Sequence, residues 1–178
     1  MKKKQELIIE IPEGFKIEVE GGRLTLSDGK DSVNKEFKAK EIKFSKKNNS
    51  VILSTEKYSR RAKALMNSIK ANIENMVEGL TKGYEYRLAI VYSHFPINVS
   101  VKGNLVEINN FTGEKRPRKA QIIGNTKVEI KGKEIIVTGK NKEHAGQTAA
   151  NLENATRIRE KDRRIFQDGI FIVSKNAR

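Results

Sequence analysis

The chain has 178 residues, enough for one domain or two small ones, and its hydrophobic fraction of 37% suffices for modest cores but not for a membrane-embedded bundle. It carries 36 lysines and arginines against 22 aspartates and glutamates, and the formal net charge of +14 is expected to attract nucleic acid, an anionic membrane or an acidic protein. The absence of cysteine excludes a disulfide framework, a thiol nucleophile and a cysteine-ligated zinc site.

The N-terminal segment does not have the pattern of a secretory signal. Its basic start at residues 1–4 is followed only by the short apolar run at residues 7–9 before Glu10. No window of the sequence approaches the roughly eighteen apolar residues that a spanning helix needs. We therefore expect neither a membrane span nor a signal peptide.

The first half of the chain predicts two β-hairpins and a helix. Residues 17–26 alternate around a Gly-Gly pair, and residues 42–53 alternate around a polar turn. The period then changes from two to 3.6, and one helical face collects Ala62, Leu65, Met66, Ile69, Ile73, Met76, Val77 and Leu80. After the helix, residues 83–90 have the aromatic-rich composition of a strand.

The second half repeats this order. Hairpins are predicted at residues 99–108 and 128–137, followed by a helix that begins near Asn141, a suitable N-cap, and a strand at residues 169–173. This helix carries smaller side chains than the first, which predicts close contact with its sheet: Ala145, Thr148, Ala149, Leu152, Ala155 and Thr156.

The repeat predicts an α+β fold of two tandem copies of one small module. Each copy is expected to be a mainly antiparallel sheet of hairpins packed on one α-helix, because each hairpin needs one covered and one solvated face. The strand at residues 83–90 is assigned to the first module, which gives modules at residues 1–92 and 93–178. No flexible linker separates them.

Residue types suited to catalysis or metal binding occur without usable partners. His94 and His144 lie at the module boundary and on the first turn of the second helix, with no second ligand at metal-binding spacing. Asp162 is expected to form a local ion pair, and Asp168 is expected to form a turn with Gly169 before the final strand. No catalytic residue, metal site or cofactor is predicted.

The basic residues are distributed differently in the two halves. Residues 1–82 have a net charge of +6 and residues 83–178 have +8, but only the second half contains dense clusters. The first module, where basic and acidic residues alternate along the strands, is therefore expected to be mostly scaffold. One cluster is expected in a loop between the hairpins, namely Lys115, Arg116, Arg118 and Lys119. The other is expected at the end of the second helix, namely Arg157, Arg159, Lys161, Arg163 and Arg164.

These clusters predict binding to a phosphate backbone. If the second helix continues, Arg157, Lys161 and Arg164 share one face. Cations there would also stabilise the helix C-terminus, but two clusters in one module exceed what that requires. Arginine outnumbers lysine in the clusters, and its planar guanidinium suits phosphate. Aromatic residues make up only 6% of the chain and do not alternate with the basic groups, so structured RNA is favoured over stacked single strands.

Three segments resemble a known family. The motifs NFTGEKRPRK (residues 110–119), EHAGQTAANLENAT (143–156) and RIREKDRRIFQDGIFI (157–172) occur in this order. The chain resembles the ribosomal protein six family of the large subunit in its archaeal form, since the Lys-Gly-rich ending of the bacterial members is missing. The resemblance spans essentially the whole chain.

The resemblance implies a cytoplasmic structural protein of the ribosome without catalytic activity. It implies docking onto large-subunit (23S) rRNA mainly through the second module, close to the sarcin–ricin loop where translational GTPases act. It also implies neighbouring large-subunit ribosomal proteins as partners, one copy per ribosome, and no small-molecule substrate. The nine residues of the two basic clusters are the candidate rRNA contacts.

Two alternatives share the charge. An RNA-processing or RNA-modifying enzyme would need a catalytic group, for which only His94, His144 and Asp162 are candidates. A peripheral membrane protein would need a basic helix face flanked by bulky aromatics, and the first helix has a core-facing stripe instead.

Overall fold

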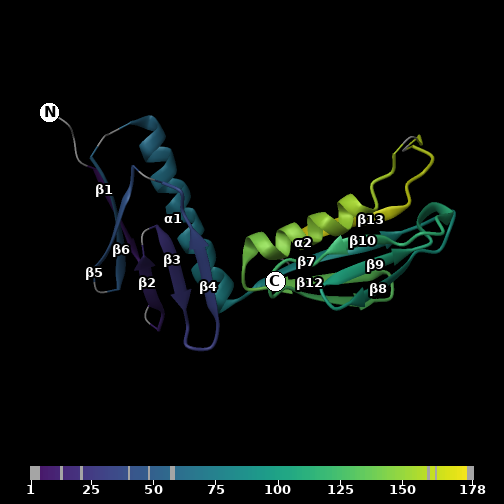
Figure 1. The fold of residues 1–178 in the computed structure, drawn as a ribbon, viewed down its shortest axis with the longest axis horizontal. Coiled ribbons are helices and arrows are strands. Elements are labelled where there is room, and N and C mark those ends of the chain that lie inside the picture. Colours follow the sequence, from purple (N-terminus) through teal and green to yellow (C-terminus); the bar gives the residue numbers. More distant parts are fainter. Residues whose placement is uncertain are drawn as a thin grey trace. The chain divides into compact units, whose positions relative to one another are not determined.

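The computed structural model describes residues 5–12, 14–20, 22–39, 41–47, 49–56, 59–159, 161–162 and 164–175. The basic start at residues 1–4, Gly21 and Asn48 of two predicted hairpin turns, and Arg163 lie outside this set. The chain divides into two compact units, residues 1–82 and residues 83–178 (Figure 1). Within the described ranges, no helix is long and apolar enough to cross a membrane.

The first unit contains two three-stranded antiparallel sheets and one long helix. One sheet has the order β1-β6-β5 and the other the order β2-β3-β4. The elements are β1 (Gln5–Glu10), β2 (Lys16–Glu20), β3 (Arg23–Ser27), β4 (Ser32–Glu36), β5 (Lys43–Lys47), β6 (Ser50–Thr55) and α1 (Arg60–Thr81). Both predicted hairpins are confirmed, as β2–β3 and β5–β6.

Helix α1 follows the predicted apolar face. Ser59 caps its N-terminus and accepts a hydrogen bond from the Ala62 backbone N–H at 3.0 Å. The buried face comprises Ala62, Met66, Ile69, Ile73, Met76, Gly79 and Leu80, with Leu65 and Val77 partly buried. It covers apolar side chains of both sheets, among them Leu24 and Leu53, which closes the core of this unit.

The second unit contains a three-stranded sheet of order β10-β9-β8 and a four-stranded sheet of order β11-β12-β7-β13. All pairings are antiparallel. The elements are β7 (Tyr84–Val91), β8 (Asn98–Lys102), β9 (Leu105–Asn109), a 3-10 turn (Phe111–Gly113), β10 (Arg118–Gln121), β11 (Lys127–Lys131), β12 (Glu134–Gly139), α2 (Lys142–Ala155) and β13 (Gly169–Lys175). The predicted α+β class with one helix per unit is confirmed.

The sequence analysis assigned strand β7 to the first module, but the structure places it in the second unit. It pairs with β12, where Tyr86 faces Val137, and with β13, where Ile90 faces Ile170. Its alternation of buried and exposed residues identifies a strand but not its partners, because pairing depends on segments far along the chain. The repeated unit is therefore strand, hairpin, strand, hairpin and helix, in which β1 corresponds to β7 and β4 to β10.

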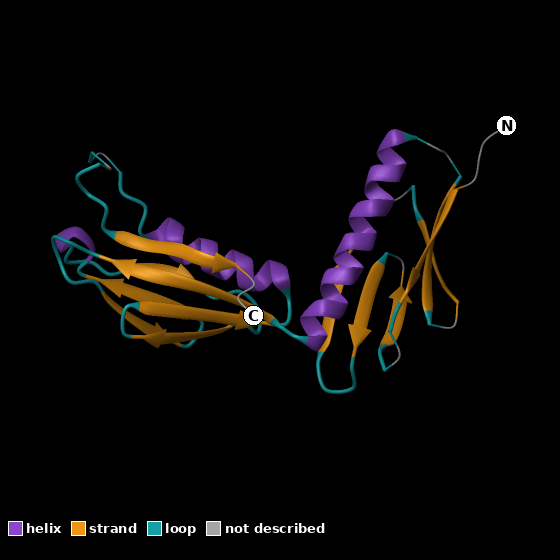
Figure 2. Cartoon of the chain, turned by 180° about the vertical axis from the view of Figure 1, so that it is seen from behind, coloured by secondary structure: helices purple, strands orange, loops and turns teal. Residues whose placement is uncertain are grey.

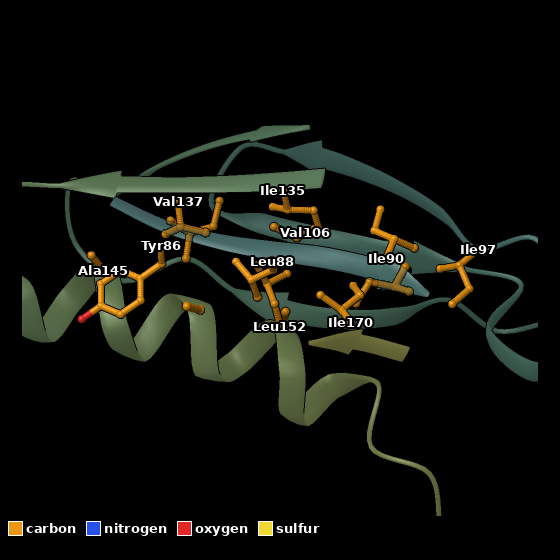
Figure 3. Close-up of a cluster of buried hydrophobic side chains, with 14 of the residues drawn as sticks. Tyr86, Leu88, Ile90, Ile97, Val106, Ile135, Val137, Ala145, Leu152 and Ile170 are labelled. Carbon is orange, nitrogen blue, oxygen red and sulfur yellow. The ribbon is translucent and has the colours of Figure 1, made fainter. Parts of the chain in front are cut away.

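The core of the second unit lies where both sheets and α2 meet (Figure 3). Leu88 and Ile90 of β7 point from the four-stranded sheet into this core, and Leu152 meets them from the helix. Gly146 allows the close approach that small residues had predicted, since a Cβ there would lie 3.1 Å from the Tyr86 hydroxyl oxygen.

Helix α2 begins as predicted but ends earlier. The Asn141 side chain accepts hydrogen bonds from the backbone N–H groups of Glu143 and His144. The helix stops at Ala155, so the proposed shared face of Arg157, Lys161 and Arg164 does not form. The Arg118 guanidinium donates a hydrogen bond to the Ala155 carbonyl, and the Thr156 hydroxyl accepts one from the Ile170 backbone N–H. These tertiary contacts replace a further turn of the helix.

Candidate nucleic-acid interface

The two basic clusters occupy two connections of the second unit. The first basic loop, residues 110–117, joins β9 to β10, and the second basic loop, residues 157–168, joins α2 to β13. In Figure 2 the second basic loop is the loop segment, partly grey, that leaves the end of α2 and returns to β13. Arg118 and Lys119 were expected in a loop but lie on β10, a short strand with only one fully buried side chain.

The first basic loop has an unusual backbone anchored by one aromatic side chain. Asn110, Thr112 and Gly113 have positive φ values of 59°, 50° and 81°. For a β-branched residue such as Thr112 this conformation costs on the order of 1–3 kcal/mol. Phe111 is 1% exposed and offsets the strain by apolar burial, while the Asn110 side-chain amide donates to the Pro96 carbonyl at 3.0 Å.

Arg118 links the first basic loop to the start of the second. Its Nε and Nη2 atoms donate to the two carboxylate oxygens of Glu114 at 2.9 and 2.5 Å. Its Nη1 atom donates to the backbone carbonyls of Ala155 at 2.9 Å and Arg157 at 3.3 Å. The guanidinium also lies 4.3 Å from the centre of the Phe111 ring.

The charges of the two loops influence one another. Hydrogen bonding from Arg118 lowers the pKa of Glu114; partial burial opposes this shift, and the charges of Arg118 and Lys161 add to it. The two loops also meet through Arg118, which donates both to Glu114 of the first basic loop and to the Arg157 carbonyl of the second. The structure therefore brings Glu114 and the start of the second basic loop to the same side chain.

The second basic loop is supported by a turn and by stacked rings. Asp162 accepts a hydrogen bond from the Arg164 backbone N–H at 2.9 Å, and its carboxylate lies 3.6 Å from the Arg164 Nε. The local ion pair predicted for Asp162 is thus confirmed. The Lys161 ammonium lies 4.8 Å from the centre of the Phe166 ring, and Phe166 stacks on His94 at 4.8 Å between ring centres.

Asp168 closes the second basic loop, and its predicted role in a turn is wrong. It is 1% exposed, and it accepts hydrogen bonds from the backbone N–H groups of Ser93 and His94 and from the Ser93 hydroxyl. Its Oδ1 atom also lies 3.2 Å from the His94 Nδ1. Burial would raise the pKa of Asp168, but the hydrogen bonds from Ser93 and His94 together hold it below its ordinary value.

The candidate contact residues differ in their surroundings. Six are exposed on the two loops or beside them: Lys115, Arg116, Arg157, Arg159, Lys161 and Arg164. The Arg118 side chain is only 29% exposed and is held by internal partners. Arg163 lies outside the described residues.

Lys119 lies on the opposite face of its sheet from Arg118. It points away from the Arg118 side of β10, because neighbouring residues of a strand face opposite sides of the sheet. Its cross-strand neighbour is Glu107, which pairs with Lys102 at 2.6 Å. The hydrogen bond from Lys102 lowers the pKa of Glu107, and the charge of Lys119 contributes to the same shift.

The histidines have structural surroundings. His94 contacts both Phe166 and Asp168, as described above, and His144 packs so closely against Gly124 that a Cβ there would clash with the His144 ring. Within the described ranges, no group of three or more His, Asp or Glu side chains could hold a metal ion.

Two supporting residues, Glu114 and Phe166, escaped the sequence reasoning, and a third, Asp168, was noticed but given the wrong role. Phe166 and Asp168 contact residues that are distant along the chain, and Glu114 holds Arg118, which itself has a distant partner. Ser93 lies 75 residues before Asp168, and Ala155 lies 37 residues after Arg118. The Glu-Lys-Arg-Pro-Arg run contained a signal for the Glu114–Arg118 pair in its opposite charges, but spacing of four residues predicts contact only within a helix.

Comparison with known proteins gives consistent matches. The family described as ribosomal protein L6 matches residues 95–169, which include both basic loops. Relatives named large ribosomal subunit protein uL6 come from Saccharolobus solfataricus (47% identical, covering 95% of this chain and 94% of the relative) and Methanocella arvoryzae (45%, 94% and 95%). The one from Methanobrevibacter smithii is 42% identical and covers 94% of both chains.

Proposed function

Because the chain belongs to the uL6 family of large ribosomal subunit proteins, we propose that it is a structural protein of the ribosome that binds large-subunit (23S) rRNA through its second unit. The first unit serves mostly as scaffold. Neighbouring ribosomal proteins are further partners, and one copy is present per subunit. Its place is the cytoplasmic ribosome, and it acts by binding and bracing RNA, without catalysis.

The observation that carries this proposal is the concentration of exposed cations on the two basic loops. The side chains of Lys115, Arg116, Arg157 and Arg159 form no ion pair with any residue that the structure describes. Cations that lack internal carboxylate partners are available to phosphate oxygens. Each phosphate neutralised also releases condensed counterions, which makes such binding favourable at low salt.

A charge-reversal experiment tests the proposed RNA-binding surface. The triple variant Arg116→Glu, Arg157→Glu and Arg159→Glu is compared with the wild-type chain for retention on large subunits through a salt wash. A matched control reverses Lys16, Arg61 and Lys63, which are exposed residues of the first unit, and has the same net charge. We expect loss of retention only for the second-unit variant; equal loss, or none, contradicts the proposal.

The salt dependence of binding gives a second test. If 6–10 phosphates are contacted, affinity for a 23S rRNA fragment should fall by roughly 10³–10⁵ between 50 and 200 mM salt. Titration of the full-length chain by filter binding or fluorescence anisotropy measures this slope. A flat dependence would mean that the basic loops do not bind phosphate.

Proximity to the sarcin–ricin loop can be tested directly because the chain has no cysteine. The substitution Arg116→Cys, with an iron chelate tethered to the new thiol, should produce hydroxyl-radical cleavage of 23S rRNA close to the sarcin–ricin loop in reconstituted subunits. The same probe at position 63 in the first unit provides the comparison. Cleavage elsewhere from position 116 would refute this location.

A further inference from the structure

We propose that Arg118 is a positioning residue, which holds the two basic loops in one arrangement without itself contacting phosphate. This inference rests on the proposed function, because it concerns how the RNA-binding surface is organised. It separates Arg118 from the exposed cations of the same cluster.

The hydrogen bonds of Arg118 support this role. A guanidinium has three nitrogen atoms, and each of them donates to an oxygen of the chain itself: Nε and Nη2 to Glu114, and Nη1 to the carbonyls of Ala155 and Arg157. A bidentate contact with a phosphate would require breaking the bonds to the Glu114 carboxylate, which are among the stronger hydrogen bonds in proteins. The planar face is also occupied, since it lies over the ring of Phe111.

These bonds connect three segments of the second unit at one side chain. Glu114 belongs to the first basic loop, Ala155 is the last residue of α2, and Arg157 begins the second basic loop. The Arg118 cation suits this place, because unpaired carbonyls at a helix C-terminus carry partial negative charge. Arg118 therefore sets the direction in which the second basic loop leaves the helix.

The other end of the second basic loop is held by Asp168, which accepts hydrogen bonds from Ser93 and His94. With both ends held, the backbone that carries the exposed cations Arg157, Arg159, Lys161 and Arg164 has less conformational freedom to lose when RNA binds. Restraining a surface in its bound arrangement improves affinity, because ordering each long side chain on binding otherwise costs about 0.5–1.5 kcal/mol, roughly a 2- to 12-fold change in affinity.

The substitution Glu114→Ala distinguishes positioning from direct contact by the sign of its effect. If Arg118 binds phosphate, removing a carboxylate frees the arginine and makes the surface more positive, so affinity for rRNA rises. If Arg118 is a positioning residue, the substitution removes two of the hydrogen bonds that hold its guanidinium in place. Affinity for rRNA then falls even though the net charge has become more favourable.

The experiment measures binding of the full-length chain to a 23S rRNA fragment for Glu114→Ala, Arg118→Lys and a control, Glu129→Ala. Glu129 is an exposed carboxylate of β11 that lies 3.6 Å from the Lys131 ammonium, so its removal changes the charge equally without touching the basic loops. We expect Glu114→Ala and Arg118→Lys to bind the rRNA fragment roughly 5- to 20-fold more weakly, because a few side chains of the basic loops must then be ordered on binding. The control should bind as well as the wild-type chain, or slightly better.

Hydrogen exchange of the free protein provides a readout independent of RNA. Both loop variants should exchange the backbone amides of residues 156–162 faster than the wild-type chain, while the amides of α1 keep their protection. Unchanged exchange, or Glu114→Ala binding at or above wild-type affinity, would overturn the positioning role. If the wild-type chain itself fails to bind rRNA, the proposed function fails, whereas exchange still tests how Arg118 holds the loops.

Discussion

The connection from β3 to β4 in the first unit spans residues 28–31, whereas the equivalent connection from β9 to β10 in the second unit spans residues 110–117. The short turn is closed by Asp28, whose carboxylate accepts from the backbone N–H groups of Lys30 and Asp31. The longer connection carries Phe111, Glu114 and two exposed cations. The same pair of strands thus supports a plain turn in one unit and a basic loop in the other.

The connections after the two helices differ in the same way. Helix α1 ends at Thr81, and β7 starts at Tyr84, whereas the second basic loop separates α2 from β13. The net charges of +6 and +8 hardly distinguish the two halves. The two units thus differ less in net charge than in where the repeat is extended, because both basic clusters lie on or beside connections that are longer in the second unit.

The largest effect should come from removing the apolar anchor of the first basic loop. Phe111→Ala deletes a side chain that is 1% exposed, and we expect a loss of about 3–5 kcal/mol in the free energy of unfolding of the second unit. Native-state hydrogen exchange across both units measures it, with the amides of α1 as internal reference. Equal loss of protection in α1 would show that the two units unfold together, which contradicts the assumption that Phe111 stabilises only the second unit.

A smaller effect should follow from Asp168→Asn, which keeps the shape but removes the charge that accepts the hydrogen bonds of Ser93 and His94. We expect the second unit to lose about 2–3 kcal/mol, the range for hydrogen bonds to a charged buried group. A double-mutant cycle with His94→Ala isolates the part carried by the histidine. Additive effects would mean that the His94–Asp168 contact does not contribute.

Acid pH should weaken the same contacts. The pKa of Asp168 and that of Glu114 are lowered in the folded chain, so the stability they provide is complete above the unfolded pKa values of about 4 and is lost as the pH falls through the folded values. Unfolding followed between pH 6 and pH 2 should show the second unit losing stability in this range. Asp168→Asn should make the loss shallower, and an unchanged pH profile for that variant contradicts the assignment.

Local patterns predicted much of the scaffold. The four hairpins and α1 were found because their alternation or helical period lies within a short window, and the N-cap Asn141 was found from its place before α2. By contrast, β10 contains only one apolar residue, Ala120, so its sequence shows no alternation of apolar and polar residues. The partners of β7 and the burial of Asp168 depend on contacts far along the chain, which no window contains.

The site was predicted in part for the same reason. Runs of basic residues identified the two loops, since charge density is visible in the sequence. The distinction between an exposed cation such as Arg116 and an internally bonded one such as Arg118 was not visible, because it depends on the carbonyls at the end of α2. Composition indicates that a surface binds anions, but tertiary hydrogen bonds decide which cations are available.

The smallest effect should come from removing the helix N-caps, and it should be the same in both units. Ser59→Ala and Asn141→Ala each remove the side chain that caps a helix N-terminus, by accepting from Ala62 in α1 and from Glu143 and His144 in α2. Each should cost its own unit about 1 kcal/mol in the free energy of unfolding, measured by hydrogen exchange. Neither cap belongs to the basic loops, so affinity for rRNA should stay at the wild-type value in both variants. If Asn141→Ala weakened binding as strongly as Glu114→Ala, the second helix as a whole, and not its Arg118-held end, would organise the RNA-binding surface.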